Sequence, residues 1–326
     1  MSIKMNRRGF GRLSSGLAAG LMAPGLVKAQ ATLPSLIKIV VPFAPGGSND
    51  VFARALAEVL GPELKTTFIV ENRPGAGGVM GSGQVVKAPA DGSTLLLTSN
   101  SIVTGNVVQA KPPFDLVNSF THLAILNRGP SLIFVKGDSK YTDLPSLFDA
   151  MRKGEVRNYG SAGIGTNAHL AGEMLNYALK TEVVHVPYRG IANVAVDIIG
   201  NNVDMTITTP ASVSGQMRSG HLKALGVTSP QVSPFFPGLK PVAEFLPGYE
   251  VESWWGVFAP PRTPAAIADT LNRKINEMVM KSRMADLFKN ESTTPVNFSV
   301  EQVRKFVGDE RDKWLAIAKA RNIQPV

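Results

Sequence analysis

The chain reads Ile37-Lys-Ile-Val-Val-Pro-Phe-Ala-Pro-Gly-Gly-Ser-Asn-Asp50, followed by the helical pattern Val51-Phe-Ala-Arg-Ala-Leu-Ala-Glu58. The β-branched run predicts a strand, the paired glycines predict a loop, and Ser48, Asn49 or Asp50 can cap the helix that follows. Because a helix N-terminus offers free N–H groups and partial positive charge, this stretch predicts an anion-binding loop. An ordinary glycine turn is the alternative. No Gly-Lys-Ser/Thr follows, as a nucleotide P-loop would require.

A second loop of the same kind is Asn158-Tyr-Gly-Ser-Ala-Gly-Ile-Gly-Thr-Asn167, which precedes the helical pattern Ala168-His-Leu-Ala-Gly-Glu173. Its glycine spacing nominally matches a dinucleotide fingerprint, which also needs a ribose-binding acid after the next strand. That strand instead leads into Pro187-Tyr-Arg189. We therefore expect a second anion-binding loop and no cofactor.

Short β-branched runs alternate with amphipathic stretches along the chain, which predicts an α/β fold with mostly parallel strands. The strands are expected at 37–41, 68–71, 94–98, 131–135, 183–186, 204–208 and 223–228, and the helices at 50–60, 79–88, 144–152, 168–179, 193–200, 264–281 and 300–321. The segment 231–264 is rich in proline and aromatic residues and is interpreted as a long connection between two lobes.

The N-terminus has the three parts of a cleavable signal peptide at residues 1–31. Basic residues come first, an apolar run of about fifteen residues follows, and Ala29-Gln-Ala31 offers a cleavage site. The run is shorter than the roughly twenty residues that span a bilayer. The pair Arg7-Arg8 favours the twin-arginine route, with the general secretory route as the alternative because Gly11 replaces the usual leucine.

Cleavage would lower the formal charge from +9 to +4, since residues 1–31 hold five basic residues and no acidic ones. The remainder shows no basic cluster with interleaved aromatics, so we expect no nucleic-acid partner. The chain has no cysteine, which predicts a protein free in the periplasm without a lipid anchor. The four histidines are scattered, without metal-ligand spacing, and no nucleophile elbow is present. We expect no metal and no enzyme activity.

Six motifs in order resemble one known family, the Bug-type periplasmic receptors of tripartite tricarboxylate transporters. They are Val41-Pro-Phe-x-Pro-Gly-Gly-x-x-Asp50, Val70-Glu-Asn-Arg-Pro-Gly-Ala-Gly-Gly78, Asp91-Gly-x-Thr-Leu-Leu96, Ser161-x-Gly-x-Gly-Thr-x-x-His-Leu170, Val184-His-Val-Pro-Tyr-Arg-Gly190 and Ser253-Trp-x-Gly-x-x-Ala-Pro-x-x-Thr-Pro264. The match covers essentially the whole chain after residue 31.

The resemblance implies a two-lobed, type II periplasmic-binding-protein fold of the Venus-flytrap kind, with a hinge crossed twice. Lobe 1 would comprise 32–130 plus 256–326, and lobe 2 would comprise 131–255. The protein would act as a monomer without a cofactor, close on a small mono- or dicarboxylate, and deliver it to a membrane permease. The residues expected to bind the ligand are Phe43, Ala44, Gly46, Gly47, Ser48, Asp50, Ser99, Asn100, Ser161, Gly165, Thr166, Asn167, His169, Tyr188 and Asp204.

Three points stay open. Family members often carry a histidine and an Asn-Pro in the stretch that reads here Asn100-Ser-Ile-Val-Thr-Gly-Asn-Val107, and this departure bears on the ligand more than on the fold. Asp50, His169 and Asp204 could also serve as acid or base in a periplasmic enzyme. A sensor kinase ectodomain is the alternative partner to a permease.

Overall fold

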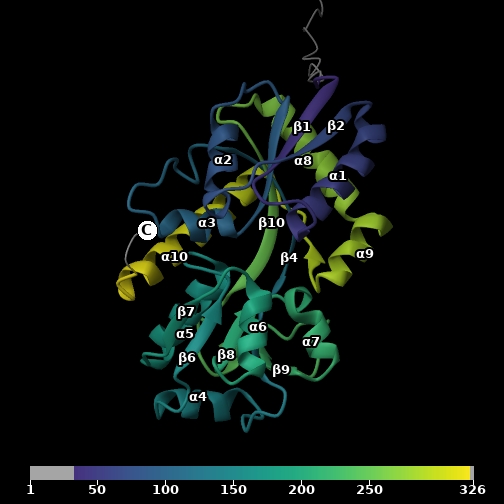
Figure 1. The fold of residues 1–326 in the computed structure, drawn as a ribbon. Coiled ribbons are helices and arrows are strands. Elements are labelled where there is room, and N and C mark those ends of the chain that lie inside the picture. The colour runs from purple at the N-terminus through teal and green to yellow at the C-terminus, as the bar shows by residue number, and fades with distance from the viewer. Residues whose placement is uncertain (1–32, 324–326) are drawn as a thin grey trace, which may run out of the picture. The chain divides into compact units, whose positions relative to one another are not determined.

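The computed structural model describes residues 33–323, so the predicted signal peptide lies outside the described residues. Two sheets organise this part of the chain (Figure 1). The first has the strand order β11-β4-β10-β3-β1-β2, and the second has the order β7-β6-β8-β5-β9. The strands are β1 Leu36–Val41, β2 Thr67–Asn72, β3 Thr94–Ser99, β4 Thr121–Pro130, β5 Leu132–Lys136, β6 Asn158–Ser161, β7 Val184–Pro187, β8 Met205–Thr208, β9 Leu222–Val227, β10 Glu252–Ala259 and β11 Thr294–Pro295.

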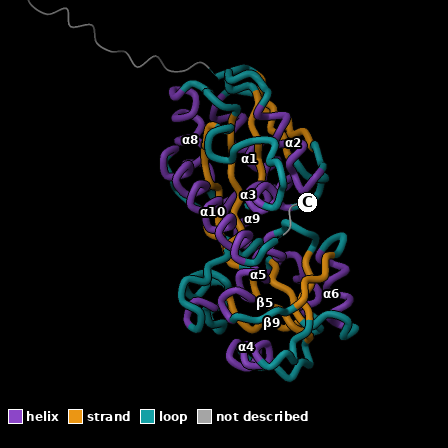
Figure 2. Tube along the Cα trace, turned by 90° about the vertical axis from the view of Figure 1, so that its left-hand side faces the viewer, coloured by secondary structure: helices purple, strands orange, loops and turns teal. Residues whose placement is uncertain are grey.

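Helices surround both sheets, as Figure 2 shows from the side. The α-helices are α1 Ser48–Leu64, α2 Val79–Val86, α3 Ser101–Val107, α4 Leu144–Arg152, α5 Asn167–Leu179, α6 Ile191–Ile199, α7 Ser214–Arg218, α8 Ala265–Val279, α9 Ser282–Asn290 and α10 Val300–Ala320, and short 3₁₀ turns lie at Ala76–Gly78, Pro210–Val213 and Val242–Glu244. No helix within residues 33–323 combines the length and the apolar character that a membrane crossing needs.

The strand directions differ from the expected mostly parallel arrangement. β1 is parallel to β2 and β3, and β6 is parallel to β7 and β8. In contrast, β10 is antiparallel to β3 and β4, and β5 is antiparallel to β8 and β9. The reason is the path of the chain: β4 continues into β5 with only Ser131 between them, so the chain enters the second sheet without a crossover helix.

Hydrogen bonds tie together the two places where the chain passes between the sheets. The Thr228 hydroxyl lies 2.8 Å from the Ser131 carbonyl oxygen and 2.5 Å from that of Val251. The N–H of Ser131 donates to the same hydroxyl at 2.9 Å. The expected return of the chain from lobe 2 to lobe 1 lies between residues 255 and 256. This boundary falls inside β10, which pairs with β4 from Glu252 onward. The segment 231–264, interpreted from its composition as a connection, therefore contains a central strand of the first sheet (Figure 1).

Candidate ligand-binding site

The first glycine loop lies at the carboxyl end of β1 and leads into α1. Gly46 has a φ of +90°, a conformation that favours glycine, and Gly47 is the extended residue that precedes the helix. Within residues 33–323, the N–H groups of Gly47, Ser48 and Asn49 donate no hydrogen bond. The start of α1 therefore combines free donors with the positive end of a helix, which suits an anion.

Asp50 holds this loop in shape. The residue is only 4% exposed, and its Oδ2 accepts hydrogen bonds from the Gly46 N–H and from Arg54 Nε, both at 3.0 Å. Its Oδ1 accepts one from Asn72 Nδ2 at 3.1 Å. Burial raises the pKa of Asp50, but the bonds from Arg54, Gly46 and Asn72 outweigh burial and hold the pKa below its usual value. Asp50 thus has its own partners, and its contact with a ligand stays a prediction.

Asn72 reaches the loop from a neighbouring strand. Besides Asp50, its Nδ2 donates to the Phe43 carbonyl at 3.1 Å. The parallel register places Asn72 directly beside Val41, the last residue of β1. The Phe43 ring packs on Gly78, where an added Cβ would lie 2.9 Å from the end of the ring. Asn72 lies within the motif Val70 to Gly78, but its contact with Asp50 depends on the pairing of β2 with β1 and cannot be predicted from that motif.

The second loop is held by its own side chains before α5 begins. The Ser161 hydroxyl donates to the Gly163 carbonyl at 2.9 Å and lies 2.6 Å from His185 Nε2. The Thr166 hydroxyl donates to the same Gly163 carbonyl at 2.7 Å and caps the helix by accepting from the His169 N–H. Gly163 and Gly165 have φ values of +135° and +76°. The sequence prediction of a glycine loop before a helix is confirmed here.

The second loop lies against the segment that follows β3. A Cβ added at Gly165 would be 2.7 Å from Val108 Cγ2 and 3.5 Å from Gly105 Cα. Ser99 and Asn100 directly precede this segment, and Asn100 Nδ2 donates to the Glu252 carbonyl at 3.2 Å. The structure therefore places Gly165 against the end of α3, the helix that begins directly after Ser99 and Asn100.

Two asparagines occupy similar places at the starts of α1 and α5. Asn49 and Asn167 each lie within the first two residues of a helix, and the Oδ1 atom of each is shielded from solvent without a hydrogen-bond partner within 33–323. Asn167 Nδ2 lies 3.5 Å from the Ser131 hydroxyl. Because a buried acceptor without a partner is costly, each Oδ1 is a natural partner for a water or a ligand donor. The sequence predicts Asn49 only as a helix cap.

His169 and His185 form a stacked pair beneath the second loop, with ring centroids 4.0 Å apart. His169 Nδ1 accepts a hydrogen bond from the Gly165 N–H at 3.2 Å, which requires that nitrogen to be unprotonated. Burial lowers the pKa of His169, and it lowers the pKa of His185 to about 3, with a further contribution from His169. Both rings are therefore neutral at physiological pH, and they support the loop.

Replacing His185 with glutamine should weaken the acid sensitivity of folding. The unfolded chain takes up a proton on His185 below about pH 6.5, whereas the folded protein resists until about pH 3. Wild-type stability should therefore fall across this range as the pH decreases. We expect this fall, measured by urea unfolding at pH 6.5 and 4.5, to be about 1 kcal/mol smaller in His185→Gln after allowance for solvent screening. His221→Gln, at an exposed position, is the control. An equal fall in the free energy of unfolding between pH 6.5 and 4.5 in all three proteins would contradict the lowered pKa of His185.

Tyr188 adjoins the second loop, whereas Asp204 does not. The Tyr188 N–H donates to the Ser161 carbonyl at 2.9 Å, and its hydroxyl donates to Asp197 at 2.6 Å. Burial and then the Asp197 carboxylate raise the pKa of Tyr188 to about 12. Asp204 precedes β8 and accepts from the N–H groups of Arg157 and Asn158 at 2.7 and 3.3 Å.

The strand directions explain why Asp204 lies apart. β6 and β8 are parallel, so Asp204 lies at the amino end of this strand pair and Ser161 lies at the carboxyl end. The sequence leaves open whether Asp204 lines the ligand pocket or caps a turn, and its bonds to the N–H groups of Arg157 and Asn158, at the opposite end of the strand pair from Ser161, favour the cap. Arg189 is exposed, and its guanidinium has no hydrogen bond or ion pair within residues 33–323.

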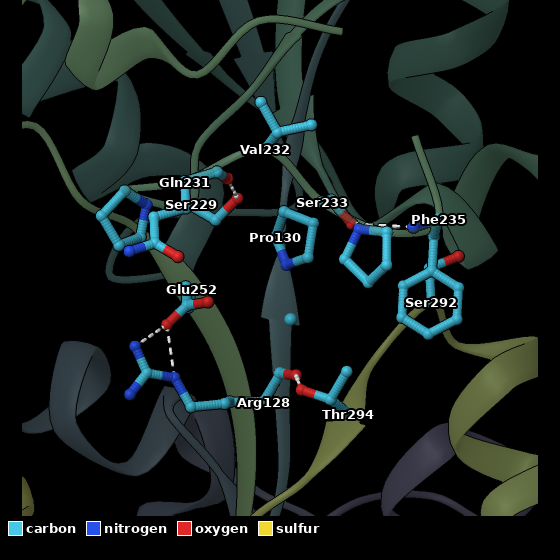
Figure 3. A pocket seen from close by; sticks show the side chains of 13 residues that line it. Arg128, Pro130, Ser229, Gln231, Val232, Ser233, Phe235, Glu252, Ser292 and Thr294 are labelled. Carbon is cyan, nitrogen blue, oxygen red and sulfur yellow. Dashed lines mark hydrogen bonds and ion pairs between the residues drawn. The ribbon is translucent and has the colours of Figure 1, made fainter. Parts of the chain in front are cut away.

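A cavity of about 370 Å³ lies beside the strands that pass between the sheets (Figure 3). Its wall combines Arg128, Glu252, Ser292 and Thr294 with the loop Ser229 to Phe235. Arg128 forms ion pairs with Glu252 and, at 3.2 Å, with Glu250. Burial raises the pKa of Glu252 despite the neighbouring Arg128, so this carboxylate depends on its partner.

Replacing Arg128 with methionine should therefore destabilise the fold by about 2 kcal/mol. Methionine has a similar length but no charge, so it loses the cation–π contact with the Phe306 ring and leaves Glu252, whose side chain is 14% exposed, beside Glu250 without its cation. Urea unfolding at pH 7 measures the change. The double variant that also carries Glu252→Gln should regain part of the loss, and a single variant as stable as wild type would show that the pair contributes nothing.

The two α/β sheets, the two passages between them and the glycine loops before α1 and α5 define the class of periplasmic solute-binding proteins. The chain belongs to the TctC family, the tripartite tricarboxylate transporter family receptors, whose model matches residues 52–323. Protein BugT of Bordetella pertussis is 33% identical over 306 residues, which cover 92% of this chain and 93% of BugT.

Two solved structures share the fold over the same length. The periplasmic binding protein BugD is 30% identical, with a TM-score of 0.75 and coverage of 89% of this chain and 98% of BugD. Rpa4515 of R. palustris, whose structure contains adipate, is 28% identical, with a TM-score of 0.78 and coverage of 89% and 98%. The expected family and fold class are thus confirmed.

Proposed function

We propose that this protein is an exported receptor that captures a small mono- or dicarboxylate and passes it to the membrane permease of a tripartite transporter. The observation that carries the proposal is the start of α1, where the N–H groups of Gly47, Ser48 and Asn49 are free within the described residues. A carboxylate there would receive several N–H bonds and the favourable field of the helix. The adipate bound to the R. palustris relative supports this ligand class.

The second loop would receive the other end of the ligand. Thr166, Asn167 and the neighbouring Asn100 offer polar groups on that side, and Asn167 Oδ1 has no partner of its own within 33–323. We propose that two lobes close around the ligand, one built on the first sheet, which includes all of β10, and one built on the second sheet. Ligand would bind the closed form best and so shift the population toward it. Bridging waters can replace a direct arginine clamp at little cost in affinity.

We further propose that the protein binds its ligand without transforming it. A general acid or base must reach the proton that it transfers. Asp50 and Asp204 already accept several hydrogen bonds from their own chain, and His169 Nδ1 accepts one from Gly165. Incubating the bound acid with purified protein and weighing it by mass spectrometry tests this point. Conversion of the acid without a partner protein would favour an enzyme instead.

A thermal-shift screen of C3 to C6 and aromatic acids tests the proposed function. We expect the ligand to bind with a dissociation constant near micromolar, which corresponds to about 8 kcal/mol of binding free energy. The screen can then use the ligand at about 100 times its dissociation constant. The ligand should then stabilise the fold by about 2.7 kcal/mol. The screen should include adipate because of the R. palustris complex. Absence of a shift with every acid would contradict the proposal.

A further inference from the structure

Glu291 brings a carboxylate to the start of α1 from a distant part of the chain. It directly follows α9, and its Oε1 accepts a hydrogen bond from the Ser48 hydroxyl at 2.8 Å, across a separation of 243 residues. Ser292, the next residue, has a φ of +55° and lines the cavity of Figure 3. The Glu291 side chain is half-buried and reaches the first loop at Ser48.

No cation compensates this carboxylate within residues 33–323. Arg54, the basic residue of α1 nearest the loop in sequence, forms its ion pair with Asp50 at 3.0 Å. Arg283 of α9 pairs with Glu58 at 2.6 Å. Glu291 is half-buried, and burial raises its pKa in spite of the Ser48 bond. A half-buried acid without a cation is unfavourable unless a ligand supplies the charge.

The first loop consequently presents two opposite features within a short distance. The N–H groups of Gly47 and Ser48 attract an anion, while Glu291 at the Ser48 hydroxyl attracts a cation or a strong donor. A plain carboxylate would satisfy the first feature and be repelled by the second. A carboxylate with an ammonium group on the adjacent carbon would satisfy both.

We propose that Glu291 is a specificity-determining residue that selects 2-amino acids over plain carboxylic acids at the first loop. The ligand carboxylate would lie at the start of α1, and its ammonium group would donate to the Glu291 oxygen that does not hold Ser48. The inference rests on the proposed function, because it assigns the ligand class of the same site.

The test compares two acids that differ only in the amino group, 2-aminoadipate and adipate, by isothermal titration calorimetry at pH 7. Wild-type protein should bind 2-aminoadipate about tenfold more tightly than adipate, the size of one partly buried charge-assisted bond. Glu291→Gln keeps a side-chain oxygen for Ser48 and removes the charge. This variant should bind adipate about as tightly as 2-aminoadipate, or more tightly.

Asp286→Asn is the matched control, because it removes the same charge from an exposed position on α9. It should retain the wild-type preference, and urea unfolding checks that all three proteins are folded. A Glu291→Gln protein that keeps the wild-type preference would overturn the inference, and so would wild-type preference for adipate. Failure of wild-type protein to bind any acid would instead contradict the proposed function, so the two failures are distinguishable.

Discussion

Replacing Gly47 with valine should abolish carboxylate binding and leave the fold intact. Gly47 has φ −83° and ψ 170°, a conformation that valine adopts readily, and a Cβ added there meets no atom within 4 Å. The new side chain would therefore fill the open space over the free N–H groups of Ser48 and Asn49 without disturbing the chain. We expect at least a 100-fold loss of affinity, or about 2.7 kcal/mol.

Calorimetry with the acid selected by the thermal-shift screen measures this loss, and urea unfolding measures the stability. Gly238→Val is the control, since Gly238 also lies in an exposed loop and a Cβ added there would likewise meet no atom within 4 Å. Arg189→Ala should have a smaller effect than Gly47→Val, because Arg189 adds at most one charge contact. Wild-type affinity in Gly47→Val would show that the first loop is only a structural turn.

Replacing Asp50 with alanine should lower both stability and affinity. The buried carboxylate joins Gly46, Arg54 and Asn72, and its removal leaves the Gly46 N–H without its acceptor and the Asn72 amide with only the Phe43 carbonyl. Because these donors are only partly buried, we expect a loss of about 2 kcal/mol of stability in total. The loop would lose its shape, so we also expect at least a 30-fold loss of affinity. Arg54→Gln, at an exposed position, should cost under about 1 kcal/mol.

The contribution of Asp50 to the free energy of unfolding should decrease as the pH falls. Its folded pKa lies below the ordinary value of 3.8, so the stabilisation is fully present above about pH 4 to 5. It should be lost as the pH falls through the lowered folded pKa. Urea unfolding between pH 7 and pH 3 should therefore show wild type and Asp50→Ala converging at the acid end. A constant difference at every pH would contradict this role.

The local signals in the sequence located both loops of the candidate site. The strand expected at 37–41 is β1, Leu36–Val41, and the helix expected at 50–60 is α1, Ser48–Leu64. The second predicted loop, 158–167, likewise leads into the predicted helix 168–179, which is α5, Asn167–Leu179. Glycines with positive φ, capping side chains and helical periodicity act over a few residues, so they can be identified without knowledge of the rest of the fold.

β10 escaped prediction for a physical reason. Seven of the eight residues Glu252–Ala259 are buried, so the strand shows no alternation of polar and apolar residues. Prolines surround it in the sequence, which favours the interpretation as a connection. Its partners β3 and β4 lie more than a hundred residues earlier, and only the pairing shows that it is central.

The site residues that were missed depend on long-range contacts in the same way. Asn72 reaches Asp50 because β2 pairs with β1, and Glu291 reaches Ser48 because α9 packs on α1. Neither contact can be inferred from the residues that are neighbours in the sequence. Conversely, Asp204 follows a suggestive pattern but lies at the opposite end of its strand pair from Ser161.

We propose that backbone N–H groups at the start of α1 hold the ligand carboxylate. Nuclear magnetic resonance of ¹⁵N-labelled protein, titrated with the acid that binds best, tests it most directly. The account predicts that the amide signals of Gly47, Ser48 and Asn49 shift strongly and saturate with the dissociation constant found by calorimetry. If these amides stay unchanged while signals around the Arg128 and Glu252 cavity shift, the ligand binds in that cavity and not at the start of α1.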